Sequence, residues 1–171
     1  MVAEAAQIVL NTPVKKLMIP INVTHTAIVT DEIHRNLLQP FIKQCETTAS
    51  KRPPPASALR YMLSTLVSYF AASYESTFGF TDGPPLHDAL TIAYVIRPEL
   101  FKCKRHRVDV ELSGVHTAGE TVVDVWNYRP CDDTWGPNGK NCLVAEELDV
   151  RHSTKLIVGN STNHIIGQRI L

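Results

Sequence analysis

Residues 84–101 read PPLHDALTIAYVIRPELF, and this stretch decides both the expected fold and the expected chemistry of the chain. Its apolar core indicates a helix over about residues 86–96, closed by the Arg97-Pro98 dipeptide. A turn rich in glycine and proline, residues 78–85, comes directly before this helix. Such a turn is suited to bring His87 and Asp88 to the open mouth of the helix, because glycine bends the chain and prolines stiffen it.

The His87-Asp88 pair is therefore the first candidate for a functional site. Free N–H groups and the positive end of the helix dipole keep Asp88 ionised, so its carboxylate can bind a hard cation. His87 can donate a proton to a leaving group near neutral pH. The dipole and any metal disfavour the imidazolium whereas Asp88 favours it, and the sequence leaves that balance open. The alternative is that Asp88 caps the helix and His87 is a surface residue.

Outward from this stretch, helical and strand patterns are mixed along the chain. Thr30, followed by Asp31 and Glu32, is typical of a helix N-cap. Gly114 and Gly119 flank the connection between two alternating segments, which predicts a β-hairpin. We expect helices over residues 3–10, 30–38 and 57–76, and strands over residues 16–23, 107–112, 121–126 and 141–146. This mixture indicates an α/β or α+β domain.

The longest helical pattern, residues 57–76, carries an apolar stripe at steps of three and four residues. Such a stripe predicts a face that is buried in the core. Tyr74 continues the helical pattern and, like Tyr69, is expected to pack within this face; the alternative is that both line a ligand pocket. The members of the stripe are Leu59, Met62, Leu63, Leu66, Tyr69 and Phe70.

Composition excludes several classes of function. Lys+Arg and Asp+Glu both number 17, so the net charge is zero and the excess of basic residues typical of a nucleic-acid-binding surface is missing. No apolar run reaches the length of a membrane span. The first residues do not have the pattern of a secretion signal, which favours a cytoplasmic location. No two cysteines form a C-x-x-C pair, so we expect free thiols at Cys45, Cys103, Cys131 and Cys142.

The remaining histidines and the tryptophans give no further site. His25 is interpreted as a structural residue. The other five histidines share no spacing that suggests zinc, so solvent-facing roles are expected for His34, His106, His116, His152 and His164. Trp126 and Trp135 are expected to be packing residues.

The central stretch also resembles the C-terminal signature of the inosine–uridine-preferring nucleoside hydrolases. The matching residues are Gly83-Pro84, His87-Asp88-Ala89, Ala93-Tyr94 and Pro98-Glu99-Leu100-Phe101. MIPINVTHTAIVT (residues 18–30) and VDVELSGVHTAGETVVD (residues 108–124) resemble two further segments of the family, and they occur in the same order. The resemblance extends over about residues 2–150.

The resemblance implies an α/β fold of Rossmann-like, mixed-sheet type, with helices and a β-hairpin. It also implies that residues 1–171 form a single partial domain, the C-terminal half of the family fold, with a divergent tail over residues 150–171. The family cleaves the N-glycosidic bond of ribonucleosides with the help of calcium. By resemblance, Asp88 is the C-terminal calcium ligand and His87 is the acid for the leaving base. The complete protein is then expected to be a homo-oligomer.

Other features of the family are missing from this sequence. The family's D-x-D-x-x-x-D-D cluster, which supplies the general base and further calcium ligands, has no counterpart, and Asp132-Asp133 is a bare pair. We therefore expect a truncated chain that binds no calcium alone, is inactive alone and self-associates through residues 16–23. Two alternatives stay open: a non-catalytic remnant that serves as a binding or assembly module, and a chance resemblance in an unrelated α/β domain.

Overall fold

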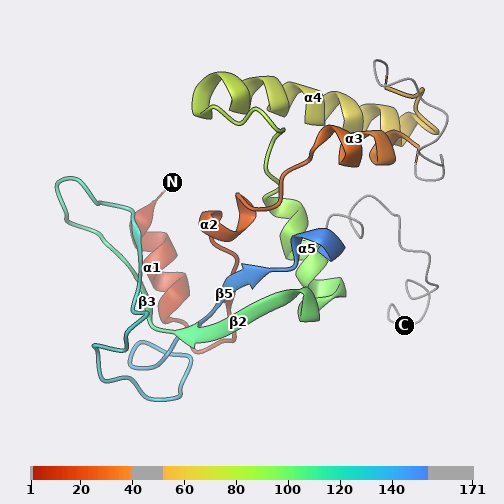
Figure 1. Ribbon diagram of the computed structural model, residues 1–171. Helices are drawn as coiled ribbons and strands as arrows, with labels where there is room; N and C mark the ends of the chain where they lie inside the picture. Colours follow the sequence, from red (N-terminus) through yellow and green to blue (C-terminus); the bar gives the residue numbers. More distant parts are fainter. Residues whose placement is uncertain (1, 40–51, 154–171) are drawn as a thin grey trace. The chain divides into compact units, whose positions relative to one another are not determined.

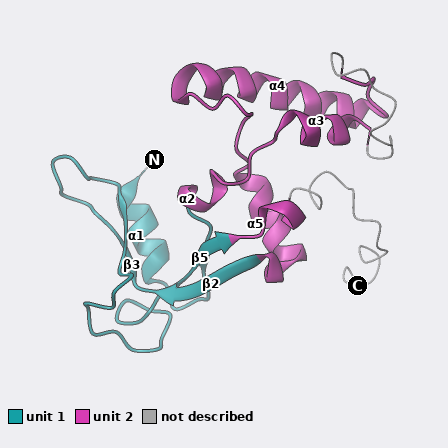
Figure 2. Ribbon diagram, viewed as in Figure 1, with its two compact units in different colours: residues 1–20, 101–147 teal, residues 21–100, 148–171 magenta. Residues whose placement is uncertain are grey.

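The computed structural model describes residues 2–39 and 52–153, and its elements mix helices with short strands (Figure 1). The chain groups into two compact units, shown in Figure 2. One unit contains residues 1–20 and 101–147, and the other contains residues 21–100 and the segment that starts at Leu148. In chain order the elements are α1 (Ala3–Asn11), β1 (Leu17–Met18), α2 (Ile21–Thr24), α3 (Asp31–Leu38), α4 (Ala58–Phe78), α5 (Asp88–Ile96), the 3-10 helix η1 (Pro98–Leu100), β2 (Phe101–His106), β3 (Val108–Val110), β4 (Thr121–Val123) and β5 (Cys142–Leu148).

The first unit is built around a three-stranded sheet with the strand order β1-β5-β2. β1 and β5 run parallel, with Leu17 opposite Leu143. β3 and β4 form a separate antiparallel hairpin. The small core of this unit consists of Val108, Cys142 and Val144, with Leu10, Met18 and Val123 packed against it. Parallel and antiparallel pairing in one chain confirms the predicted mixed-sheet α/β class.

Side-chain amides close the outer edge of the hairpin. The backbone N–H of Val110 donates to Oε1 of Gln7, and that of Val108 donates to Oδ1 of Asn141 at 2.8 Å. The Nδ2 of Asn141, which is fully buried, donates in turn to the carbonyl oxygens of Val108 and Leu10. These amides satisfy backbone groups that a further strand would otherwise have to pair.

Two strand predictions needed correction. Residues 16–23 were expected to form one strand, but the strand covers only Leu17–Met18 and a short helix begins at Ile21. Pro20 explains the break, because proline has no N–H for a ladder and is readily accepted at the start of a helix. The strand β2 was not predicted at all, because Lys102, Lys104 and Arg105 give its sequence the composition of a polar loop.

The second unit confirms the predicted helix ends. The side chain of Thr30 accepts a hydrogen bond from the N–H of Ile33, as an N-cap does. Ser57 caps α4 through the N–H of Arg60, and Gly79 ends that helix with a left-handed φ of 74°. The predicted burial of the apolar stripe over residues 57–76 is wrong, however, because none of the residues of α4 is buried. The side chains of α4 that bond to α3 are the polar Arg60 and Ser64.

Several single-residue predictions were also wrong. His34 and His106 were expected to face solvent, but both are almost completely buried. His34 bonds to Ser64 of α4, and His106 bonds to Glu146 on β5. Trp126 was expected to pack, but it is 79% exposed, whereas Trp135 packs under the guanidinium of Arg105.

Other predictions hold or lie outside the described residues. Cys103, Cys131 and Cys142 are free thiols, as expected. Cys45, His164 and most of the predicted tail over residues 150–171 lie outside the part of the chain that the structure describes. Within the described residues, no helix is both long enough and apolar enough to cross a membrane.

The His34–Ser64 bond makes the packing of α3 on α4 sensitive to pH. The Nε2 atom of His34 lies 2.6 Å from Ser64 Oγ. Burial, which has the largest effect, and the charge of Arg52 both lower the pKa of His34 below its usual 6.5. The unfolded chain therefore takes up the proton first, so the free energy of unfolding should fall as the pH drops below about 6.5. Urea titrations at several pH values will measure this slope. In His34→Gln the slope should be shallower, and an unchanged slope would contradict the assignment.

Candidate functional site

The predicted site residues lie at the mouth of α5, in the second unit. His87 is the N-cap residue of α5 and Asp88 is its first helical residue. The N–H of Leu90 donates to the carbonyl of His87 at 3.0 Å, which closes the first turn. Leu90 and Ala93 bury the inner face of the helix, so its N-terminal end is held in place. Asp88 is exposed and His87 is half-buried, in agreement with the placement expected from the sequence.

A short antiparallel bridge delivers His87 to this position. The N–H of Val29 donates to the carbonyl of Pro84, and the N–H of Leu86 donates to the carbonyl of Ala27, both at 2.9 Å. Gly83 makes the approach possible: its φ is 129°, and a Cβ atom there would lie only 2.1 Å from the backbone oxygen of Val29. A glycine is therefore required where the chain turns into the site.

Both ring nitrogens of His87 have hydrogen-bond partners. Nδ1 lies 2.8 Å from Thr24 Oγ1, and Nε2 lies 2.7 Å from the hydroxyl of Tyr74. The hydroxyl of Thr24 donates its only hydrogen to the carbonyl of Ile21, so Oγ1 accepts from Nδ1–H. Neutral His87 therefore carries its proton on Nδ1 and accepts the O–H of Tyr74 at Nε2. These bonds join α2, α4 and α5 through one imidazole.

The environment of His87 settles the balance that the sequence left open. Burial lowers the pKa of His87 below its usual 6.5, the charge of His25 lowers it further, and Asp88 acts in the opposite direction. Desolvation is the largest of these effects, so the imidazole is neutral at pH 7. Its protonated form is correspondingly a stronger acid than an ordinary imidazolium.

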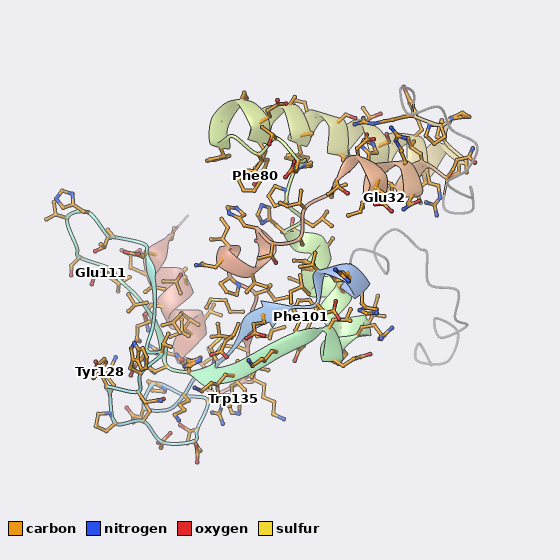
Figure 3. The ribbon with its side chains drawn as sticks, viewed as in Figure 1. Glu32, Phe80, Phe101, Glu111, Tyr128 and Trp135 are labelled. Carbon is orange, nitrogen blue, oxygen red and sulfur yellow. The ribbon has the colours of Figure 1, made fainter. Side chains whose placement is uncertain are left out.

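Aromatic rings surround the same imidazole. The ring of His25 lies 5.5 Å from that of His87 and 5.2 Å from that of Phe80, and Tyr74 contacts Phe80 at 5.7 Å. Figure 3 shows Phe80 just after the C-terminal end of α4. The edge-to-face geometry of Phe80 with both neighbours is a favourable one for aromatic rings. This cluster offers flat apolar surface beside a proton donor.

Sequence reasoning found His87 and Asp88 but not the partners of His87. Thr24 was not considered, and Tyr74 was favoured as a packed residue of its helix. The hydrogen bonds to His87 span 63 and 13 residues, distances over which no helical or strand period operates. The available signal was the Thr24-His25 dipeptide inside a family-like segment.

A calcium site needs more ligands than Asp88 alone. The described residues contain no group of three His, Cys, Asp or Glu side chains that could hold a metal ion. Calcium takes six to eight oxygen ligands. Asp88 alone, an exposed carboxylate at a helix end, supplies too few of these ligands to hold the ion.

Similar known proteins provide separate evidence on the family of this chain. Residues 3–155 match the model of the inosine-uridine preferring nucleoside hydrolase family. The chain belongs to this family. A probable ribonucleoside hydrolase of Dictyostelium discoideum is 34% identical and aligns with 98% of this chain but only 45% of its own length. An inosine-uridine preferring nucleoside hydrolase of Crithidia fasciculata is 34% identical over 74% of this chain and 35% of its own.

Solved structures show the same fold. A purine-preferring ribonucleoside hydrolase of Gardnerella vaginalis superimposes with a TM-score of 0.64 at 22% identity, over 92% of this chain and 44% of that one. A plant nucleoside hydrolase gives a TM-score of 0.68 at 20% identity with the same coverage. The chain thus spans less than half the length of each of these relatives. The match runs through both compact units.

Proposed function

We propose that this chain provides the leaving-group side of a ribonucleoside hydrolase site. The observation that carries the proposal is the Thr24–His87–Tyr74 hydrogen-bond chain at the mouth of α5. In the overall reaction, water adds to C1′ of the ribose, the N-glycosidic bond breaks, and the base leaves with its electron pair. A purine or pyrimidine base leaves more readily when a proton reaches one of its ring nitrogens.

The protonated state of His87 is the one that can act as the acid. Imidazolium donates through Nε2–H to the oxygen of Tyr74, which frees the phenolic O–H to point away from the ring. As the glycosidic bond breaks, Tyr74 passes its proton to the base and receives the proton of His87. Thr24 keeps the imidazole oriented throughout, because its oxygen continues to accept from Nδ1–H. The lowered pKa of His87 makes this transfer easier.

The aromatic cluster supports a flat base as the group that leaves. His25 and Phe80 lie in contact with each other beside the Tyr74–His87 pair. Stacking against such rings is a common way to hold a nucleobase. Asp88, at the positive end of α5, is proposed as a ligand that this chain contributes to the family's calcium site. Calcium dependence and a cytoplasmic location remain parts of this proposal.

A segment exchange tests the function. Residues 3–155 would replace the matching part of the Dictyostelium discoideum relative, and the chimera would be assayed on inosine and uridine with calcium. We expect the chimera to hydrolyse these nucleosides and its Asp88→Ala variant to lose that activity. The isolated chain is expected to show no activity, because its described residues lack a carboxylate cluster. Turnover by the isolated chain that disappears in Asp88→Ala would contradict the partial-site assignment.

The second candidate function is a non-catalytic binding or assembly module. It is favoured by two observations: the described residues contain no group of three or more His, Cys, Asp or Glu side chains that could hold a metal ion, and the large apolar side chains of α4 are exposed. A chimera that folds cooperatively but hydrolyses neither nucleoside would favour this alternative over the hydrolase.

A further inference from the structure

The long helix α4 has its most apolar row on the outside. Its less exposed row contains Ser64, Val67, Ala71 and Tyr74, with Ser64 bonded to His34 of α3 and Tyr74 bonded to His87. At about 100° per residue, the large apolar residues of α4 form a second row whose centre lies roughly 110° around the helix from this row. We call this second row the α4 stripe: Leu59, Met62, Leu63, Leu66, Tyr69, Phe70 and Ser73.

The α4 stripe is unusual for a surface. Its six large side chains are between 36% and 71% exposed, and the row contains no charged residue over about 21 Å of helix. Scattered apolar residues are normal on protein surfaces, but a continuous apolar row indicates an interaction site. The spacing of the stripe repeats every seven residues, which is the pattern with which one helix packs on another.

We infer that the α4 stripe is the site of self-association, with α4 of a second copy of this chain packed antiparallel across it. The positions of the stripe are symmetric about Leu66. In an antiparallel pair centred there, Met62 lies opposite Phe70, Leu63 opposite Tyr69, and Leu66 opposite Leu66 of the other copy.

This symmetry is what distinguishes a second copy from another partner. A twofold interface must present the same patch on both subunits, so every stripe position has to meet another stripe position. The α4 stripe meets that condition throughout, down to Leu59 opposite the small Ser73. The net charge of zero adds no long-range repulsion between copies.

The exposed area of the α4 stripe is also close to the area that a stable interface buries on each partner. A stable interface buries about 800 Å² on each partner. The exposed parts of two aromatic rings, three leucines and a methionine supply most of that area in one strip. The interface proposed here differs from the self-association expected from the sequence, which was assigned to residues 16–23.

Sedimentation equilibrium of the full chain at micromolar concentration tests the inference. The wild type is expected to be a dimer, and Leu66→Glu is expected to weaken the dimer by at least about 100-fold, because two like charges would meet at the axis. Tyr61→Glu is the matched control: Tyr61 is 64% exposed on the same helix but lies off the stripe. Circular dichroism confirms folding, and Leu66→Gln replaces the glutamate variant if that one does not fold.

Cross-linking fixes the arrangement. Under mild oxidation, a mixture of the Met62→Cys and Phe70→Cys chains is expected to form the mixed disulfide, identified by peptide mapping, faster than either chain links to itself. A wild-type monomer, a dimer unaffected by Leu66→Glu, equal dissociation by Tyr61→Glu, or the absence of the mixed disulfide would each overturn the proposal. A stripe covered by a different protein would leave the purified chain monomeric.

Discussion

Replacing His87 with alanine in the chimera is expected to lower kcat for inosine by about 10²–10⁴-fold, the usual contribution of a general acid. The substitution removes both the proton source and the partner that holds the hydroxyl of Tyr74, 2.7 Å from Nε2. The loss should fall on kcat more than on KM, because the proton moves only in the transition state. Steady-state kinetics with inosine will measure it.

An activated substrate separates acid catalysis from a loss of structure. The leaving group of p-nitrophenyl riboside departs as a stable anion and needs no proton. His87→Ala should therefore hydrolyse it at nearly the wild-type rate, and His116→Ala, at an exposed histidine, should leave both substrates unaffected. Equal losses on inosine and on the nitrophenyl substrate would show that His87 serves only to hold the structure.

The pH dependence has a definite sign. Since burial lowers the pKa of His87 below 6.5, the imidazolium becomes populated only on the acid side of neutrality. The share of the inosine rate that depends on His87 should therefore rise as the pH falls toward that pKa. The rate with the nitrophenyl substrate should show no such increase that depends on His87.

Replacing Gly83 with alanine is expected to cost more than about 4 kcal/mol of unfolding free energy, an unusually large effect for one methyl group. The added Cβ would lie 2.1 Å from the carbonyl oxygen of Val29, whose N–H donates to Pro84 in the bridge that holds residues 84–86. The backbone next to this bridge must shift for the methyl group to fit. Urea denaturation, followed by circular dichroism, will measure the loss.

Gly79 provides the matched control for this substitution. It also has a left-handed φ, 74°, but a Cβ atom there would meet nothing within 4 Å. Gly79→Ala should therefore cost only the backbone strain, about 1–2 kcal/mol. If the two variants were equally stable, the clash at Val29 would not be the reason that a glycine is needed at position 83.

The sequence predicted those elements whose signals are local. The predicted N-cap at Thr30 was confirmed, because capping involves hydrogen bonds within one turn. The helix predicted over residues 57–76 lies within two residues of α4 at each end. The strand β2 was missed because its pairing with β5 is remote. Its Lys102 reaches Glu147 on that strand, 45 residues later, which no local pattern records.

Burial was predicted less well than helix formation. The repeat in α4 showed that an apolar row exists, but a repeat carries no information about what covers it. In the same way, His34 and His106 looked like surface residues because the partners that allow their burial, Ser64 and Glu146, are 30 and 40 residues away. Periodicity identifies a face, and tertiary contacts decide its environment.

In the candidate site, too, local features were predicted and long-range contacts were not. The turn and helix mouth placed His87 and Asp88 correctly, because that geometry depends on a few consecutive residues. Which ring nitrogen of His87 carries the proton depends on Thr24 and Tyr74, which lie on two other helices. Residue types at the mouth of a helix therefore suggest chemistry, while the tautomer requires the fold.

The discontinuity of the first unit has a consequence for the order in which the protein matures on the ribosome. Residues 1–20 are synthesised before residues 21–100, yet their sheet partner, β5, is synthesised only after all of residues 21–100. The amide bond from Asn141 to Leu10 likewise joins positions 131 residues apart. Contacts of such sequence separation form slowly. Residues 21–100, which make up most of the second unit, can therefore begin to fold during translation. In contrast, α1 and β1 must wait, with their apolar side chains accessible to chaperones, until β5 has been synthesised.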